Sequence, residues 1–190
     1  SALAEKYPVY YANGNHEYRV KTDTERYEDR YERYAKQLRR AGVVLLENES
    51  VLLPETGIRI FGVEIDMDYY KKLRKSVMKV SYLNSLLGRP CADEYNILLA
   101  HNPDYFQAYA GWGADLVLSG HVHGGIMRLP VLGGVLSPAL RLFPRYDGGL
   151  YEEGKSKMVL GRGLGTHTLP IRVFNPGELI VVRLEPERGN

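Results

Sequence analysis

The chain has 190 residues, of which 44% are hydrophobic and 25% are charged. This composition is typical of a globular protein with one ordinary core, and it excludes a disordered or fibrous chain. The 25 Lys and Arg residues nearly balance the 23 Asp and Glu residues, and the resulting net charge of +2 predicts no nucleic-acid partner.

Cysteine content and hydrophobic run length bear on the cellular setting. Cys91 is the single cysteine, which excludes an internal disulfide and a cysteine-based zinc site. No apolar run reaches the ~18 residues of a membrane span, and no secretory signal opens the chain. These features predict a soluble, cytoplasmic protein.

The first third of the chain predicts alternating strands and helices. Residues 1–7 resemble the end of a helix, and PVYYA (8–12) is typical of a short buried strand. An amphipathic helix is expected over 23–41, because its apolar residues recur on one face: Tyr27, Tyr31, Tyr34, Ala35 and Leu38. Strands are expected over 43–48, 50–53 and 58–65, the last two as a hairpin.

The remainder continues as an α/β chain. Residues 67–88 favour helix, 95–100 and 115–119 favour buried strands, and a helix is expected to begin near Pro103. Residues 124–154 are rich in Gly and Pro and predict a long loop, followed by strands over 157–163, 171–174 and 179–185. We find no linker or internal repeat, so residues 1–190 are expected to form a single domain.

Four of the five histidines directly follow predicted strands: His16, His101, His121 and His123. Ligands of α/β sheets gather at the carboxyl ends of strands, and neutral imidazole is a common transition-metal ligand. Asn15 could add a carbonyl oxygen. Two histidines at i and i+2 would point the same way if residues 121–123 were extended. A lone histidine after a strand is more often a turn residue, but the set as a whole predicts a metal site.

Three motifs carry a family resemblance: GNHE (14–17), LLAHNP (98–103) and GHVH (120–123). They resemble the third, fourth and fifth motifs of the calcineurin-like metallophosphoesterases. The stretches GVEID, GHVHGGIMRLP and GRGLGTHTLPIRVFNPGEL are similar to the bacterial membrane-associated phosphodiesterase branch of that family. The resemblance covers essentially the whole chain and implies a four-layer α/β/β/α sandwich.

The resemblance also implies a phosphodiesterase or pyrophosphatase that uses a hydroxide held by two divalent ions. Manganese is the expected ion, with iron, zinc and magnesium as alternatives. The candidate ligands are Asn15, His101 and His121 for one ion and His123 for the other. His16 would contact the substrate phosphate as general acid, Arg128 would bind substrate, and Glu17 is expected to orient the turn. The substrate could be lipid-linked, and the intact protein membrane-associated.

Two family motifs, Asp-x-His and Gly-Asp-x-x-Asp, do not occur before residue 14. The resemblance therefore implies an N-terminally truncated domain that binds metal weakly or not at all and has little activity alone. An exposed strand edge beside 8–12 would favour a homodimer or a complementing N-terminal segment. The alternative function is a non-catalytic fragment or assembly module with a vestigial metal site.

Overall fold

The computed structural model describes residues 2–71, 76–125, 127–129, 133–136, 145–165 and 172–186, with only the backbone described at 127–129 and 133–136. Its strands are β1 (Val9–Tyr11), β2 (Val43–Leu45), β3 (Glu49–Leu52), β4 (Ile58–Val63), β5 (Tyr95–Ala100), β6 (Leu116–Ser119), β7 (Met127–Leu129), β8 (Gly133–Leu136), β9 (Gly149–Glu153) and β10 (Ser156–Leu160). Its helices are α1 (Asn15–Thr22), α2 (Thr24–Tyr27), α3 (Arg30–Arg40), η1 (Met67–Tyr70), α4 (Val80–Leu87), η2 (Pro103–Tyr105) and α5 (Phe106–Trp112).

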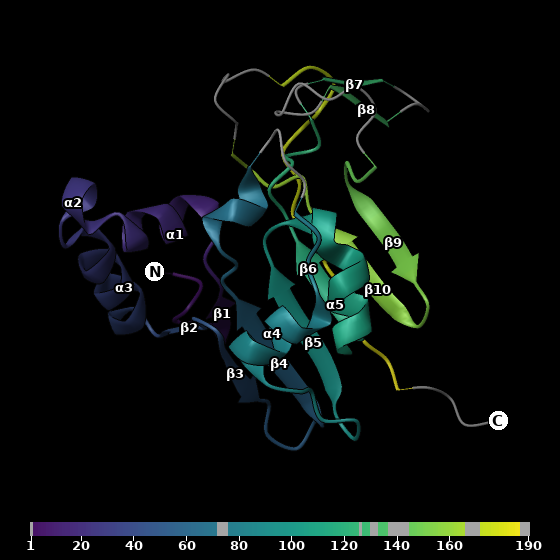
Figure 1. Cartoon of the computed structure of the whole chain (residues 1–190), viewed down its shortest axis with the longest axis horizontal. Coiled ribbons are helices and arrows are strands. Elements are labelled where there is room, and N and C mark those ends of the chain that lie inside the picture. The colour runs from purple at the N-terminus through teal and green to yellow at the C-terminus, as the bar shows by residue number, and fades with distance from the viewer. Residues whose placement is uncertain are drawn as a thin grey trace.

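A six-stranded sheet in the order β3-β4-β5-β6-β10-β9 forms the centre of the fold (Figure 1). Its four inner strands are mutually parallel, and β3 and β9 pair antiparallel with them at the two edges. The predicted hairpin of β3 and β4 is confirmed. Parallel inner strands place the carboxyl ends of β5 and β6, each followed by a histidine, at the same end of the sheet.

The two faces of this sheet bury different residues because side chains alternate along each strand. One face packs Leu98, Val117 and Met158 against α4 and α5. The other face packs Ile60, Ile97 and Leu116 against the β2 side of the molecule. The second sheet is the parallel pair β1–β2, which is covered on its outer side by α1 and α3.

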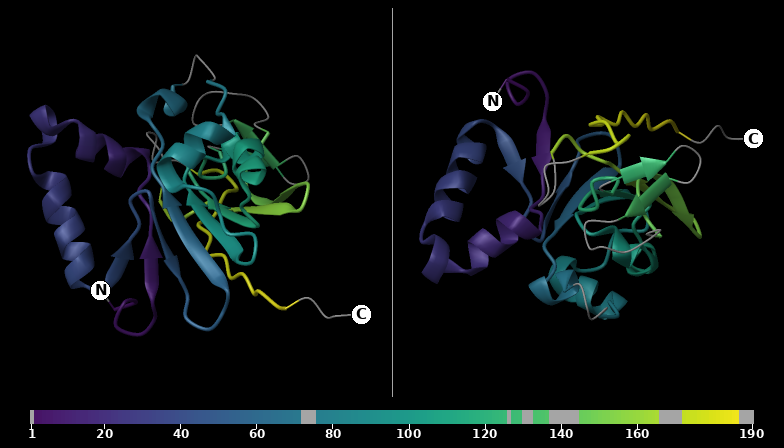
Figure 2. Two further views of the ribbon diagram at one scale, coloured as in Figure 1. Left: turned by 60° about the horizontal axis from the view of Figure 1, so that its bottom comes forward. Right: turned by 90° about the horizontal axis from the view of Figure 1, so that it is seen from above.

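The layers follow one another as helices α1–α3, the β1–β2 pair, the six-stranded sheet, and helices α4 and α5 (Figure 2). The expected α/β/β/α sandwich is therefore confirmed. The two sheets approach most closely where Gly62 of β4 faces Leu46 and Ala12, because a Cβ at Gly62 would lie 2.5 Å from Leu46 Cβ. Among the described residues, no helix is long and apolar enough to cross a membrane.

Three expectations about secondary structure are corrected. The predicted helix over 23–41 is two helices, interrupted at Glu28, whose φ is 53°. Only α3 packs on the sheet, through Tyr31 and Ala35, whereas α2 buries no residue, so no packing holds a continuous helix together. The predicted loop over 124–154 contains β7, β8 and β9. The strand β9 exposes most of its residues, and its pairing with β10 defines it more than its hydrophobic pattern does.

The third correction concerns residues 179–185, which form neither helix nor strand despite their apolar pattern. Leu179 and Val181 are 84% and 88% exposed, while Ile180 and Val182 are 37% and 40% exposed. Exposure therefore alternates as in a strand with one face open. No strand in the described part of the chain pairs with this segment, which explains why the strand predicted from its sequence is not formed.

Candidate metal centre

The motif GNHE begins helix α1. Gly14 is its N-cap, with φ −89° and ψ −177°, and its amide donates to Glu17 Oε2 at 3.1 Å. The expectation that Glu17 orients this turn is confirmed. Space is tight here, because a Cβ at Gly14 would lie 3.0 Å from Cε1 and 3.1 Å from Nε2 of His101. The start of α1 is therefore pressed against the histidine that follows β5.

Asn15, His101 and His121 converge from three different strands. They follow β1, β5 and β6, and His121 Nδ1 lies 3.2 Å from Asn15 Oδ1. The ring centroids of His101 and His121 are 5.1 Å apart. The Gly120 amide donates to the His101 carbonyl at 3.2 Å, which ties the ends of β5 and β6 together. The predicted meeting of these motifs at one edge is thus observed.

The turn carrying His121 and His123 is not extended, which corrects the expected i, i+2 geometry. His121 has φ 71° and His123 has φ 49°, both in the left-handed region. The Val122 amide donates to the Gly120 carbonyl at 2.8 Å, and the Gly125 amide donates to the Val122 carbonyl at 2.9 Å. Left-handed non-glycine residues cost about 1–3 kcal/mol each and persist where the surroundings fix them, often at functional sites.

His16 and His123 complete the histidine cluster. The His16 side chain is exposed, and His123 is partly exposed. Burial, with smaller contributions from His123 and His16, lowers the pKa of His101 to about 4. Burial also lowers the pKa of His123, with a contribution from Arg172. At neutral pH the His101 imidazole is therefore neutral and keeps a nitrogen lone pair for a ligand.

Asn175, in a segment near the end of the chain, holds the turn that carries His121 and His123. Asn175 is 2% exposed, and its Nδ2 donates to the carbonyls of His123 at 2.7 Å and Gly125 at 2.8 Å. Arg172 donates to the carbonyls of Arg162 and Gly165. We did not predict these residues, although both lie in the quoted stretch GRGLGTHTLPIRVFNPGEL, whose resemblance was the available signal.

Tyr70 is a further neighbour that the sequence did not reveal. Its ring lies 5.3 Å from the His121 ring and 6.5 Å from the His101 ring, measured between centroids. Burial raises the pKa of its hydroxyl, with smaller contributions from Tyr105 and other acidic groups. Tyr70 therefore forms an uncharged aromatic wall beside the two histidines.

The donor set is suited to one ion more than to two. Asn15 Oδ1 and the imidazoles of His101 and His121 are mixed oxygen and nitrogen donors, which suit a transition metal. Within the described ranges, no group of three His, Cys, Asp or Glu side chains has metal-binding geometry. The side chain of Arg128 and residue His167 lie outside the described residues.

Comparisons with known proteins agree with the fold and the motifs. The family model for calcineurin-like phosphoesterases matches residues 1–125. The Escherichia coli protein named phosphodiesterase YaeI is 30% identical over 169 residues, covering 87% of this chain and 54% of that protein. YpbG of Bacillus subtilis is 29% identical over 189 residues, covering 93% of this chain and 58% of that protein.

A third relative, the Bacillus subtilis metallophosphoesterase YkuE, is 35% identical over 91 residues, or 48% of this chain and 31% of that protein. No solved structure matches the chain. The chain spans about half the length of the first two relatives and less of the third. With a family model that matches most of its length, the chain belongs to the calcineurin-like phosphoesterase family.

Proposed function

We propose that this chain carries the metal-binding histidine half of a phosphodiesterase or pyrophosphatase centre. In this proposal Asn15, His101 and His121 hold one divalent ion, manganese by preference, and His123 contributes to a second. The observation that carries the proposal is the 3.2 Å approach of Asn15 Oδ1 to His121 Nδ1, between residues that are far apart in sequence. A turn or capping role for each residue separately would not require that approach.

Each side chain has a defined chemical task in this scheme. A bound divalent ion supplies Lewis acidity, which polarises a phosphoryl group and lowers the pKa of a coordinated water. His101 offers a neutral imidazole because burial lowers its pKa. Asn15 offers a carbonyl oxygen and adds no negative charge that would repel phosphate. His16, which is exposed, donates a proton to the leaving oxygen of the substrate.

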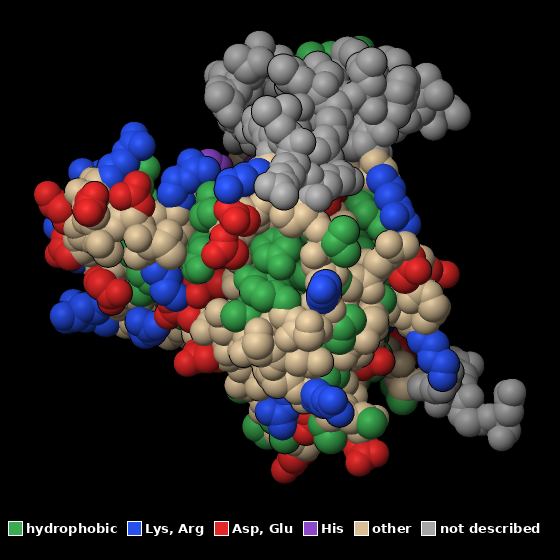
Figure 3. Space-filling view, in the orientation of Figure 1, with side chains coloured by type: hydrophobic (Ala, Val, Ile, Leu, Met, Phe, Trp, Pro, Cys, Tyr) green, Lys and Arg blue, Asp and Glu red, His purple; other side chains and the backbone are tan. Residues whose placement is uncertain are grey.

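The substrate class follows from the family and from the electrostatics of the described side chains. Asn15 and the neutral imidazole of His101 add no negative charge to the site, so a bound divalent cation would attract an anionic phosphoester. Arg128 contributes a further phosphate contact. A lipid-linked phosphodiester and membrane association of the whole protein are part of this proposal. Lysines and arginines are interspersed with acidic residues over α1–α3 (Figure 3), a distribution that does not favour a nucleic acid.

Metal affinity of the chain alone is expected to be low. One ion has three candidate donors in the described residues, whereas His123 alone represents the second, and no described carboxylate bridges the two positions. A bridging carboxylate would offset the mutual repulsion of two cations. We therefore propose little or no hydrolysis by the isolated chain unless the missing ligands are supplied by another segment.

The test combines metal analysis with hydrolysis of a chromogenic phosphodiester at millimolar Mn²⁺. Wild type, His16→Ala and His121→Ala are compared, with Lys155→Ala in the exposed β9–β10 turn as a matched control. His121→Ala should lose bound metal and any activity, and His16→Ala should lose activity while retaining metal. Measurable metal content or measurable hydrolysis that is equal in all four proteins would contradict the proposal.

A second candidate is an assembly module, which two surface features favour. In the described residues β1 pairs only with β2, so its other edge carries unpaired backbone groups. Leu179 and Val181 are also highly exposed on an extended segment. We propose a homodimer or capture of a complementing N-terminal segment through these edges. Light scattering that finds a monomer at high concentration would contradict homodimer formation.

A further inference from the structure

Glu64 lies at the point where the two sheets and α1 meet. It directly follows β4, is 5% exposed, and its carboxylate accepts from Asn13 Nδ2 at 2.6 Å and from Lys21 Nζ at 2.7 Å. Its backbone amide donates to Asn48 Oδ1 at 2.8 Å. A buried carboxylate is stable only when such partners replace water, so both contacts are required by Glu64 itself.

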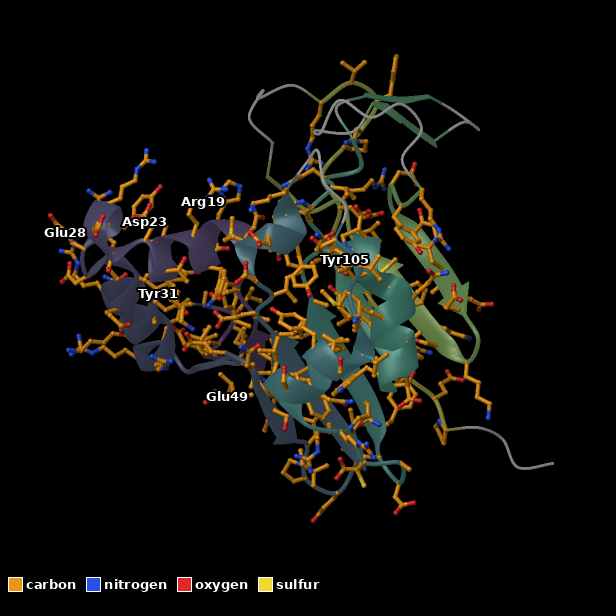
Figure 4. All side chains as sticks on the ribbon, viewed as in Figure 1. Arg19, Asp23, Glu28, Tyr31, Glu49 and Tyr105 are labelled. Carbon is orange, nitrogen blue, oxygen red and sulfur yellow. The ribbon has the colours of Figure 1, made fainter. Side chains whose placement is uncertain are left out.

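These contacts belong to a larger network in which Lys21 and Arg39 balance the charges of Glu47 and Glu64. Lys21 also pairs with Glu47 at 2.6 Å, and the Tyr31 hydroxyl donates to the same carboxylate at 2.6 Å. Asn13 Nδ2 contacts the Tyr31 hydroxyl at 2.5 Å as well. Tyr31 is carried by α3, in the outer helical layer (Figure 4). The network therefore joins α1, α3 and the ends of β1 and β4.

The network reaches the candidate metal centre through Asn13. Asn13 is 2% exposed and immediately precedes Gly14, where even a Cβ would lie only 3.0 Å from His101 Cε1. A shift of this backbone would change the spacing between the start of α1 and the His101 ring and the 3.2 Å distance between Asn15 Oδ1 and His121 Nδ1. Glu64 thus holds that backbone from the end of β4 in the six-stranded sheet, through its contact with Asn13.

We infer that Glu64 is a positioning residue for the metal centre, acting through Asn13 to fix the start of α1 against His101. This inference rests on the proposed function for its consequence, which is metal binding. The restraint that Glu64 places on the start of α1 does not depend on that function, because its contacts are present whether or not an ion is bound.

The decisive measurement is amide hydrogen exchange of the whole chain, comparing wild type with Glu64→Gln and Glu94→Gln. Glu94 is the matched control, since it pairs with Arg59 at the opposite end of β4. Loss of a charge-assisted hydrogen bond predicts about tenfold faster exchange at the Gly14 and Tyr18 amides in Glu64→Gln. Glu94→Gln should leave these two amides unchanged.

Asn13→Ala is a second variant that removes the same contact from the other side and leaves Glu64 paired with Lys21. It should reproduce the faster exchange at Gly14, and the double variant with Glu64→Gln should add little, because the two residues act as one unit. Unchanged exchange at Gly14, or a uniform rise that includes Leu98 and Val117 in the central sheet, would overturn the positioning role.

Mn²⁺ titration of the same variants separates this inference from the proposed function. Glu64→Gln is expected to weaken Mn²⁺ binding about tenfold relative to wild type and Glu94→Gln, in line with the lost hydrogen bond. Equal weakening in both variants would mean that Glu64 matters only for stability. If no variant binds Mn²⁺, the proposed function fails, while the exchange data still decide whether Glu64 fixes the start of α1.

Discussion

Gly62→Ala tests the close approach of the two sheets. The added Cβ would lie 2.5 Å from Leu46 Cβ, 2.6 Å from the Leu46 carbonyl oxygen and 3.2 Å from Ala12 Cβ. Non-bonded carbon atoms prefer separations of about 3.5–4.0 Å, so the residues after β2 must move by roughly 1 Å. The contacts are backbone and Cβ atoms, which cannot relieve the clash by rotating a side chain.

The expected change in the free energy of unfolding combines two opposing contributions. Overpacking of this kind costs about 1–3 kcal/mol, and replacing glycine by alanine returns about 0.4–1 kcal/mol by restricting the unfolded chain. We expect a net loss of about 1–2 kcal/mol in the free energy of unfolding. For a domain of this size, that loss lowers Tm by roughly 2–8 °C.

Urea unfolding followed by circular dichroism measures the change. Gly161→Ala serves as the control, because a Cβ there would meet its nearest neighbours at 3.6 Å or more, with no left-handed φ. Gly161→Ala should be neutral within about 0.5 kcal/mol. A Gly62→Ala protein as stable as wild type would refute the packing of β4 directly against the residues after β2.

Three further predictions concern the site and its surroundings. Gly14→Ala should displace the His101 ring and weaken Mn²⁺ binding in calorimetry, and unchanged affinity would contradict the tight contact. Asn175→Ala removes the hydrogen bonds to the carbonyls of His123 and Gly125 and should lower the free energy of unfolding by about 1–3 kcal/mol in urea, whereas a neutral effect would contradict its bracing role. Burial raises the pKa of Glu47, but the Lys21 hydrogen bond helps lower it below 4.5 overall. Stability from Glu47 is therefore complete above 4.5 and lost as pH falls through the lower folded value, and Glu47→Gln should flatten this acid loss in pH-dependent unfolding.

The strands of the central sheet were predictable because their residues are buried continuously or in alternation. The pattern of YNILLA predicts β5, and the side chains of Ile97, Leu98 and Ala100 are indeed buried. The prediction of one continuous helix over 23–41 was wrong. Helical periodicity in a sequence does not indicate which turns of the helix have a sheet to pack against. Residues 179–185 were predicted to form a strand and do not, since a strand requires a neighbouring strand that its own sequence does not encode.

The sequence predicted which residues of the candidate site lie together, but it did not predict the backbone conformation that carries them. Placing histidines after β5 and β6 follows from strand order, which the apolar runs reveal. The left-handed φ of His121 and His123 does not follow from their own residue types, because hydrogen bonds from a segment some 50 positions away hold this turn. Glu64 is equally hidden, since nothing in GVEID indicates that its carboxylate meets Asn13.

Mn²⁺ titration of the chain labelled with ¹⁵N-histidine, followed by NMR, tests most directly whether the separated motifs build one metal site. Paramagnetic broadening detects a nearby ion even at low affinity. The imidazole resonances of His101 and His121 should broaden at the lowest Mn²⁺ concentrations, followed by those of His123. Resonances of His101 and His121 that stay sharp at millimolar Mn²⁺, or that broaden only after those of other side chains, would contradict the site.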